Sequence, residues 1–347
     1  DRLRRTYLCG SLPLLVVGKR EPLKISRSLG SLINRGVEYI QAEVENIEIN
    51  DRRVRTSIGS LPFDYLVIAT GAEYDWDLVP GSRQCHSFYN LYTACKLRNT
   101  LRHFRSGRVI IAISRLPYKC PPAPFETSML MEQLFKEKGI RKDVEIHVFS
   151  PEPMPMKLVG PKTSAVFKDR LAGKGIILHE GETISYIDPD SRRATFQSGE
   201  TIDYNLMITV PAHQSPDVIR EAGLLNDSGW IPVDPATLAT QHDHIYAIGD
   251  VTSLPMANDL PLPKAGVLAS GEGEAVARNL AAEIQNGQKT AYLGEGYCFI
   301  DHGNNKVALI RGKFLAEGKP DVQLTSASEQ WHRKKLRFES DWRHWKV

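Results

Sequence analysis

The sequence predicts an α/β protein with two Rossmann-like dinucleotide-binding domains and a C-terminal α+β domain. The first observation behind this fold class is an internal repeat. Residues 36–71 and 175–211 follow one plan, in which an opening apolar segment and an inserted meander precede a last apolar strand. The offset is 175 − 36 = 139 at the start and 203 − 64 = 139 at the end. Two copies of one domain explain this constant offset.

The second observation is a strand, turn and helix that open the second copy. Residues 108–114 contain a continuous apolar run, Val109 to Ile113, which predicts a buried parallel strand. Pro124 to Lys138 predicts a helix, and Gly139 is placed to end it. A third observation is a change of character near residue 289, where two apolar segments, 297–303 and 307–310, predict a hairpin.

These patterns divide the chain into four parts. We expect residues 1–105 and the return segment 236–288 to form the first dinucleotide-binding domain, residues 106–235 the second, and residues 289–347 the C-terminal domain. The second copy opens at Val109, so the first would open at 109 − 139 = −30. We therefore expect the chain to be a fragment that lacks the first strand and its glycine loop. Asp1 then stands where such domains place an acid on the adenosine ribose, although a solvated terminus explains it equally well.

Composition excludes several classes of protein. The 347 residues are 41% hydrophobic and 24% charged, with a formal net charge of +3, so no nucleic acid or other polyanionic partner is indicated. No apolar run approaches the length of a membrane span. The five cysteines are widely spaced and form no CxxC pair, which argues against a zinc ribbon or a disulfide scaffold and predicts no metal site. The cysteine pattern does not exclude individual catalytic thiols.

The turn of the second copy contains Cys120 and no glycine. A dinucleotide-binding domain normally places a glycine-rich loop here, so that backbone amides approach a pyrophosphate. Pro121, Pro122 and Pro124 instead stiffen the turn and remove amide donors. Cys120 precedes a helix N-terminus, whose partial positive charge favours a thiolate. We expect sulfur redox chemistry where a relative binds nicotinamide; the alternative is a buried thiol in a tight turn.

Two polar sites follow the repeat. Gly249 and Asp250 end a short buried strand, where α/β sheets bind ligands and a carboxylate can accept hydrogen bonds from a polyol. Lys264, Ala265 and Gly266 begin a predicted helix that runs to about Gln285. A cation and free amides at this N-terminus would stabilise an anionic ring such as a reduced flavin. A turn aspartate and a surface lysine are the plainer alternatives.

The last segment, residues 331–347, is aromatic and basic. Its aromatic residues fall on one side at helical spacing, as in a helix that lies at a membrane interface, and the alternative is a helix that packs them on its own domain. The aromatic residues are Trp331, Phe338, Trp342 and Trp345, and the basic ones are Arg333, Lys334, Lys335, Arg337, Arg343 and Lys346.

The order of these motifs resembles a known family. The motifs are Ala69-Thr70-Gly71, Cys120 in its proline turn, Gly249-Asp250, Lys264-Ala265-Gly266 and Cys298. In this order they are similar to the sulfide:quinone oxidoreductases and the flavoprotein subunit of flavocytochrome c sulfide dehydrogenase, two branches of the glutathione reductase superfamily. The superfamily motifs imply bound FAD. The proline turn coupled with Cys298 is more specific to the sulfide-oxidising branch.

The resemblance also implies roles for individual residues. Cys120 and Cys298 would face each other over the flavin and form a redox-active disulfide or polysulfide bridge that sulfide attacks. Glu126 matches an acid proposed as proton acceptor, although a helix N-terminal acid is a common structural feature. Cys9 resembles the cysteine that joins FAD covalently in the cytochrome-linked branch. The residues expected at the cofactor are Asp1, Cys9, Ala69, Thr70, Gly71, Gly249, Asp250, Lys264, Ala265 and Gly266.

The predicted function is therefore FAD-dependent oxidation of sulfide, or of a small thiol, to zero-valent sulfur, with electrons passed to a quinone. A peripheral membrane location follows, on the cytoplasmic or the periplasmic side. One alternative keeps the sulfide chemistry but donates electrons to a cytochrome c subunit, and Cys9 favours it. A second is a type II NADH:quinone dehydrogenase, which would need the second copy to bind NADH. A third is a flavin-binding or assembly protein without activity.

Overall fold

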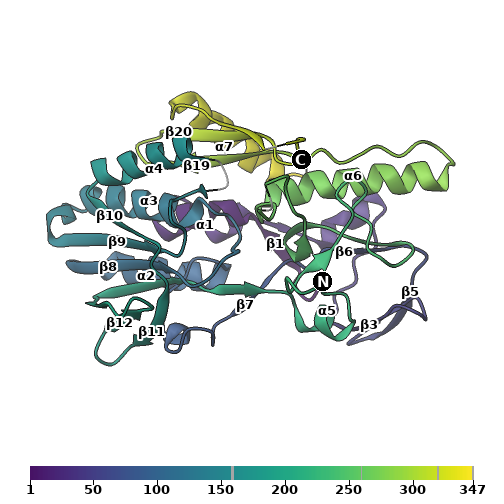
Figure 1. Ribbon diagram of the computed structural model, residues 1–347, viewed down its shortest axis with the longest axis horizontal. Helices are drawn as coiled ribbons and strands as arrows, with labels where there is room; N and C mark the ends of the chain where they lie inside the picture. The colour runs from purple at the N-terminus through teal and green to yellow at the C-terminus, as the bar shows by residue number, and fades with distance from the viewer. Residues whose placement is uncertain (158–159, 259, 319, 346–347) are drawn as a thin grey trace.

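The computed structural model describes residues 1–157, 160–258, 260–318 and 320–345. The molecule is elongated, with two α/β lobes at its ends (Figure 1). One lobe holds β8, β9, β10 and the helices α2, α3 and α4, and the other holds β3, β5, β6 and α6. The C-terminal strands β19 and β20 and helix α7 lie above α1 and α3 in this view. Lys346 and Val347 of the predicted C-terminal helix lie outside the described residues.

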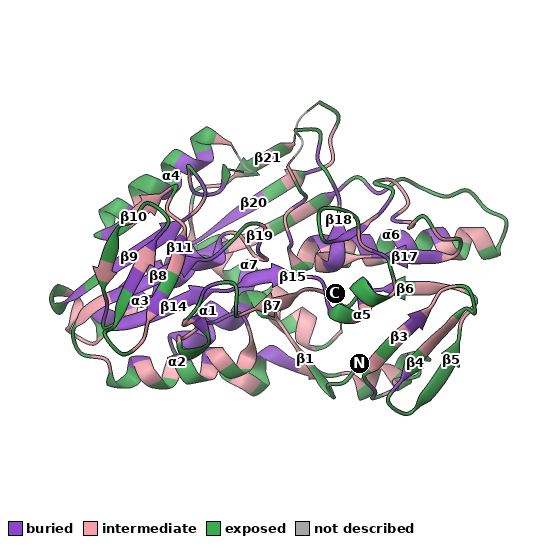
Figure 2. Ribbon diagram, turned by 60° about the horizontal axis from the view of Figure 1, so that its bottom comes forward, coloured by how far each residue is buried: buried purple, intermediate pink, exposed green. Residues whose placement is uncertain are grey.

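The second copy of the repeat contains the central parallel sheet. Its strand order is β10-β9-β8-β14, and both neighbours of β8 run parallel to it. The strands are β8 (Gly107–Ile113), β9 (Val144–Ser150), β10 (Ile176–Glu180) and β14 (Leu206–Val210). Figure 2 shows β8, β9 and β14 buried along most of their length, as the continuous apolar run of β8 predicted.

Alternate residues of this sheet serve two cores. Val109 and Ile111 point into the large core that contains α3 (Ala123–Glu137), whereas Ile110 and Ala112 face the core under a meander. The predicted end of α3 is confirmed: Gly139 has φ +71°, and the Ile140 N–H donates to the Phe135 carbonyl at 2.9 Å. The meander strands are β11 (Ile184–Asp188), β12 (Arg193–Phe196) and β13 (Thr201–Asp203), and α4 (Pro161–Gly173) contacts β10.

The first copy repeats the meander. It consists of β3 (Val44–Glu48), β4 (Arg53–Thr56) and β5 (Gly59–Pro62), in the same antiparallel order. Each meander has a register shift in its first strand, between Val44 and Asn46 in one and between Ile184 and Tyr186 in the other. These shifts are related by the repeat, because 184 − 44 = 140 and 186 − 46 = 140. The last strand, β6 (Leu66–Ile68), pairs parallel with β17 (Ile245–Ala247).

The opening segment of the first copy is less regular than that of the second. In the second copy this segment is β10, whereas residues 37–43 of the first form no strand. They lie beside residues 1–3, where the Ala42 N–H donates to the Asp1 carbonyl at 3.2 Å and the Asp1 amino group donates to the Ile40 carbonyl at 3.2 Å. These two hydrogen bonds are too few to form a β-ladder. In the second copy, β10 forms a full parallel ladder with β9.

Short elements connect the lobes. The strands β7 (Glu73–Asp75) and β15 (Ala212–Gln214) pair antiparallel between them. Helix α2 (Leu91–His103) belongs to the lobe of β8, and the Asn90 side chain caps its first turn by accepting the Thr93 N–H at 2.8 Å. The remaining short elements are β1 (Arg5–Tyr7), α1 (Leu12–Val16), β2 (Ser26–Ser28), α5 (Asp217–Glu221), β16 (Ile231–Pro232) and β18 (Thr252–Ser253).

The C-terminal part contains the predicted hairpin and helices. Helix α6 (Gly266–Ile284) begins and ends close to the predicted positions. The hairpin is β19 (Glu295–Asp301) with β20 (Val307–Lys313), and β21 (Asp321–Leu324) extends it. Helix α7 (Glu329–Arg343) follows. Among the described residues, no helix combines the length and the apolar character that crossing a bilayer requires.

Helix α7 packs its aromatic residues on the protein itself. The Arg27 guanidinium lies 4.1 Å from the Trp342 ring centroid and 3.4 Å from that of Trp345. Phe338 contacts Tyr297 and Phe299 of β19. These side chains therefore fit the alternative that the segment packs its aromatic residues on the protein itself. Lys335, one of the basic residues around these aromatic side chains, is 4% exposed and lies inside the fold.

Candidate functional site

Cys120 lies in a fixed turn directly before α3. Its N–H donates to the Lys264 carbonyl at 2.7 Å, and its carbonyl accepts the Ala123 N–H at 2.9 Å. Its φ of +54° is in the left-handed region, which a residue with a side chain adopts at a cost on the order of 1 kcal/mol. The prolines and these two hydrogen bonds hold the thiol in one place, as the sequence predicted for this turn.

Cys298 lies on β19, opposite Ile310 of β20, and its thiol meets that of Cys120. Both cysteines are free. Together they line an apolar hollow, called here the thiol pocket, which encloses ≈ 510 Å³ of space that opens to solvent. Its other lining residues are Pro121, Pro122, Met156, Pro263, Ala265, Val267, Leu268, Tyr297, Ile310 and Phe314.

The Cys120 side chain is held as a protonated thiol. A hydrogen bond with Cys298 raises the pKa of Cys120 well above its usual range, and burial and the negative charge of Glu126 raise it further. The sequence suggested the opposite, because Cys120 precedes a helix N-terminus. That expectation is wrong, since the partial charge of a helix end is outweighed when a thiol is enclosed by apolar groups beside a second thiol.

Glu126 is buried on the first turn of α3 and faces away from solvent. Its Oε1 accepts hydrogen bonds from Lys335 Nζ at 2.9 Å and from the Asp301 N–H at 3.1 Å. Burial raises the pKa of Glu126 to about 7, against the opposing charge of Lys335. The carboxyl can therefore exchange a proton near neutral pH, and its charge acts on Cys120.

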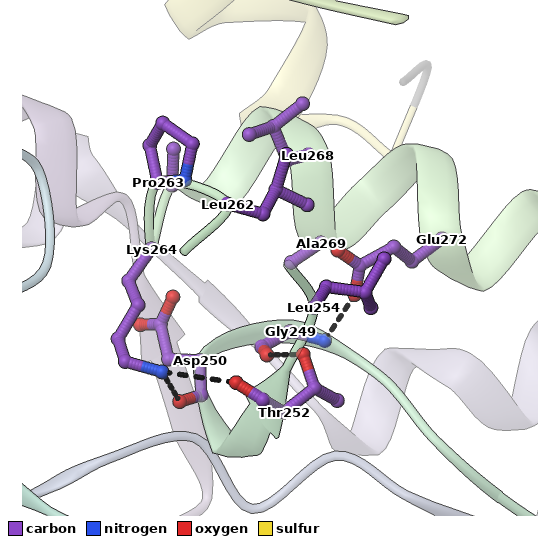
Figure 3. Close-up of a pocket in the computed structure, with 11 residues that line it drawn as sticks. Gly249, Asp250, Thr252, Leu254, Leu262, Pro263, Lys264, Leu268, Ala269 and Glu272 are labelled. Atoms are coloured by element: carbon purple, nitrogen blue, oxygen red, sulfur yellow. Dashed lines mark hydrogen bonds between the residues drawn. The ribbon is translucent and has the colours of Figure 1, made fainter. Parts of the chain in front are cut away.

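A second hollow, the carboxylate pocket, begins at the carboxyl end of β17 (Figure 3). It encloses ≈ 230 Å³. Gly249 has φ +76°, and a β-carbon there would lie 3.2 Å from Ala269 Cβ. The Glu272 carboxylate accepts the Gly249 N–H, and burial raises the pKa of Glu272. Its full lining is Gly249, Asp250, Thr252, Leu254, Leu262, Pro263, Lys264, Ala265, Leu268, Ala269 and Glu272.

Asp250 has an unsatisfied acceptor. Its Oδ1 is buried without a hydrogen-bond partner, and burial raises the pKa of Asp250. Because β6 and β17 run parallel, Ala69, Thr70 and Gly71 leave the sheet at the same edge as Asp250. Ala69 and Thr70 are exposed there, and nothing lies within 4 Å of a β-carbon built on Gly71. An unpaired acceptor beside an open turn fits the hydroxyl groups of a flavin nucleotide.

Lys264 does not project from the start of α6 as the sequence suggested. It is buried, and its Nζ donates to the carbonyls of Asp250 at 2.7 Å and Thr252 at 3.1 Å. The ammonium also lies 3.5 Å from the Trp230 ring centroid. Burial lowers the pKa of Lys264 to about 8. With its donors used in this way, Lys264 ties the segment before α6 to the end of β17 rather than facing a ligand.

The remaining predicted residues lie apart. Cys9 is exposed, but protein atoms crowd it closely enough that desolvation raises its pKa, and the charges of Lys119 and Asp250 reach it. It therefore stands near the carboxylate pocket, and covalent attachment of flavin stays a prediction. Asp1 is exposed and accepts the Leu3 N–H at 2.9 Å. Ala265 lines both pockets, and Gly266 is the exposed first residue of α6.

Sequence reasoning missed several residues of the site. Lys335 and Asp301 complete the surroundings of Glu126, and Glu272 holds Gly249. Lys119 lies 4.7 Å from the Tyr74 ring centroid and acts on Cys9. Glu272 follows Lys264 by two helical turns, a spacing that could have indicated it. Lys335 follows Trp331 by four residues and precedes Phe338 by three, so helical spacing places it on the aromatic side of the helix, a signal that could have indicated its burial.

Comparison with known proteins identifies the family. Residues 13–273 match the family described as pyridine nucleotide-disulphide oxidoreductase. The chain is 25% identical over 320 residues to the mitochondrial sulfide:quinone oxidoreductase of Mus musculus, a match that covers 88% of this chain and 69% of the relative. It is also 25% identical over 310 residues to the type II NADH:quinone oxidoreductase of Staphylococcus haemolyticus, with 82% of this chain and 74% of that one covered.

The fold is that of a solved relative. The crystal structure of the sulfide:quinone oxidoreductase from Aquifex aeolicus superposes with a TM-score of 0.87 at 22% identity, over 99% of this chain and 84% of that chain. This superposition establishes the fold. The family membership rests on the match over residues 13–273. The chain therefore belongs to the pyridine nucleotide-disulphide oxidoreductase family, as an oxidoreductase related to the sulfide:quinone oxidoreductases.

Proposed function

We propose that this protein oxidises sulfide to zero-valent sulfur through Cys120 and Cys298 and passes the electrons through FAD to a quinone. The observation behind the proposal is that two free thiols, 298 − 120 = 178 residues apart, meet in an apolar pocket that shares a wall with the carboxylate pocket. The sulfide:quinone oxidoreductases among its relatives support the substrate and the acceptor.

The thiol pair supplies the sulfur chemistry. In its oxidised form, HS⁻ attacks one sulfur of the Cys120–Cys298 disulfide, forms a persulfide there and releases the other cysteine as a thiolate. The overall change is HS⁻ → S⁰ + H⁺ + 2 e⁻. Glu126, with a pKa of about 7, is the acid placed to take up a proton. The apolar lining suits an uncharged sulfur product.

The carboxylate pocket suits the cofactor. Asp250, with its unpaired Oδ1, and the turn at Ala69–Gly71 would hold FAD through its hydroxyl groups. Bound FAD would accept the two electrons that sulfide gives up and return them to a quinone. Lys264 and Glu272 keep the pocket in shape by fixing Asp250, Thr252 and Gly249.

The quinone implies contact with a membrane surface. Leu23 is 72% exposed in η2 (Pro22–Ile25), a segment that α7 contacts. Ile33 is 69% exposed in η3 (Gly30–Arg35), where Ser31 accepts a hydrogen bond from Nε1 of Trp345, just after α7. Leu336 of α7 is 41% exposed beside basic residues. Exposed apolar side chains within a basic surface are typical of peripheral membrane attachment, which we propose for this face.

Oxidation of NADH by a quinone is the second candidate, because a type II NADH:quinone oxidoreductase is among the relatives. The turn before α3 argues against it, since Pro121, Pro122 and Pro124 offer no amide to a pyrophosphate. Rapid bleaching of the flavin by NADH in a stopped-flow experiment would favour this candidate over sulfide oxidation.

Anaerobic sulfide titration of the flavin-loaded protein tests the proposal. We expect sulfide to bleach the flavin of the parent, and we expect Cys120→Ser and Cys298→Ser each to slow this reduction at least about a hundredfold, because each removes one half of the pair. Cys95→Ser, on α2, is the matched control and should reduce as fast as the parent. Equal rates in the parent and both pair variants would disprove the role of the thiols.

A further inference from the structure

Lys335 is a buried ammonium group at the meeting point of three elements. It is 4% exposed on α7, and its Nζ lies 2.9 Å from Glu126 Oε1 on α3 and 3.6 Å from Asp301 Oδ2 on β19. Both acids are also buried, at 2% and 3% exposure. A buried charge is tolerated when it is paired and costly when one partner is removed, so the three groups depend on one another.

This triad connects the two elements that hold the cysteines. Cys120 lies six residues before Glu126, at the entrance to α3, and Cys298 lies three residues before Asp301 on β19. The Glu126 Oε1 that binds Lys335 also accepts the Asp301 N–H at 3.1 Å. One carboxylate oxygen therefore ties α3 directly to the backbone of β19, close to both thiols.

The surrounding charges favour an ion pair between Lys335 and Glu126. Burial opposes the charge of Lys335, but Glu126, Asp301 and Glu339 together raise the pKa of Lys335 above its usual value. Glu339, from the same helix, is also held by Arg20 at 2.7 Å and by Ser11 at 2.9 Å. Without the ammonium, Glu126 and Asp301 would be two buried carboxylates side by side, and Glu126 would take up a proton and hold Asp301 less firmly.

We propose that Lys335 is a positioning residue for the Cys120 and Cys298 pair, acting through Glu126 and Asp301 to fix the register of α3 against β19. The inference rests on the proposed function, because it assigns the residue that keeps the two thiols at reacting distance. Two groups held in a fixed geometry react as if at a high local concentration, and a loose register lowers that concentration. Helix α7 thereby contributes to the thiol pocket without lining it.

The test is the thiol–disulfide equilibrium of the flavin-loaded protein in glutathione buffers, without sulfide. The two protein thiols and one oxidised glutathione give the Cys120–Cys298 disulfide and two reduced glutathiones. The extent of closure is read by alkylation of free thiols and mass spectrometry of the two peptides. We expect Lys335→Met to lower the equilibrium constant for closure at least about tenfold, and Lys335→Arg, which keeps the charge but carries a larger head group, about threefold.

Gln133→Leu is the matched control. Gln133 makes a second tie between α3 and the β19–β20 turn, because its Oε1 accepts the Asn304 N–H at 2.7 Å. It lies two helical turns from Glu126, so its loss should lower the thermal midpoint without changing the closure constant. Lys335→Arg keeps the test decisive if Lys335→Met does not fold.

The outcomes separate this inference from the proposed function. Closure constants in both Lys335 variants equal to that of the parent would overturn the positioning role and leave the sulfide chemistry standing. A parent that forms no Cys120–Cys298 disulfide in any glutathione buffer would overturn the proposed function itself. A fall in the constant for Gln133→Leu as large as that for Lys335→Met would also overturn the inference, since general loosening of the hairpin would then suffice.

Discussion

The thiol pocket and the carboxylate pocket share Pro263, Ala265 and Leu268 as a common wall but are built from opposite chemistry. In the thiol pocket the lining is apolar around two cysteines, and the acids Glu126 and Glu152 are buried outside the lining. In the carboxylate pocket, Asp250 and Glu272 are part of the lining. The first arrangement suits uncharged sulfur, and the second suits a ligand that donates hydrogen bonds.

One segment separates the two pockets. Residues 263–268 lead into α6, and within them the Lys264 carbonyl binds the Cys120 N–H while the Lys264 ammonium binds the Asp250 and Thr252 carbonyls. The backbone of one residue thus supports the thiol pocket, and its side chain supports the other. A change in this wall should affect both pockets, whereas a change behind either one should affect that pocket alone.

The largest expected effect concerns Glu152, which is buried outside the thiol pocket. Glu152 is 7% exposed, and burial raises its pKa to about 7. A hydrogen bond from the Met156 N–H lowers the pKa and offsets part of this shift. A folded-state pKa above the unfolded value means that the folded protein holds the proton longer. Stability is therefore full below about pH 4.5 and falls as pH rises toward 7, by about 3 kcal/mol in total.

Glu152→Gln removes this titration. We expect its thermal midpoint to rise relative to the parent between pH 5 and pH 8, measured by differential scanning fluorimetry of the flavin-loaded protein. Glu43→Gln, at an exposed position, is the control and should show no such trend. A midpoint difference that stays constant across this range would show that Glu152 is not held neutral behind the pocket wall.

The next effect breaks the carboxylate pocket alone. Asp250→Ala removes the unpaired acceptor, and we expect FAD affinity to fall about tenfold or more, because hydrogen bonds to a charged group contribute about 1.5–3 kcal/mol. The measurement is FAD titration of the apoprotein followed by fluorescence, with the Cys120 and Cys298 thiols counted in parallel. Asp250→Asn keeps an acceptor oxygen and should retain most of the affinity. Unchanged binding by Asp250→Ala would remove Asp250 from the cofactor site.

The sequence predicted the parts of this arrangement that depend on local pattern. The apolar run of β8, the glycine that ends α3, the position of Asp250 after β17 and the repeated meander all follow from periodicity and spacing. These features need no knowledge of distant partners, because a buried parallel strand and a helix end are encoded within a few residues.

The parts that failed depend on partners far along the chain. Helical spacing places Lys335 on the aromatic side of α7, but nothing in the local sequence identifies its partner Glu126, which lies 209 residues away. The pKa of Cys120 rises because Cys298 meets it, which local helix geometry does not reveal. The meeting of the two thiols was implied by family resemblance rather than by pattern, and their redox role stays a prediction.

The smallest expected effect is at the wall that the two pockets share. Gly296 of β19 lies two residues before Cys298, and a β-carbon there would meet Leu268 Cδ2 at 2.5 Å. The φ of Gly296 is not positive, and the clash is with the flexible end of a side chain, so Gly296→Ala should cost only about 1 kcal/mol. Leu268 must move, and because it lines both pockets, FAD affinity and thiol closure should change together by about twofold to threefold.

Gly271→Ala provides the control for this last variant. Gly271 is on α6, and the nearest atom to a β-carbon there is Tyr292 Cε2 at 3.5 Å, an ordinary contact. This change should stabilise the helix by up to about 1 kcal/mol and leave both pockets unchanged. If Gly296→Ala altered only one of the two readouts, Leu268 would not couple the pockets, and the sulfur and flavin environments would be independent despite their common wall.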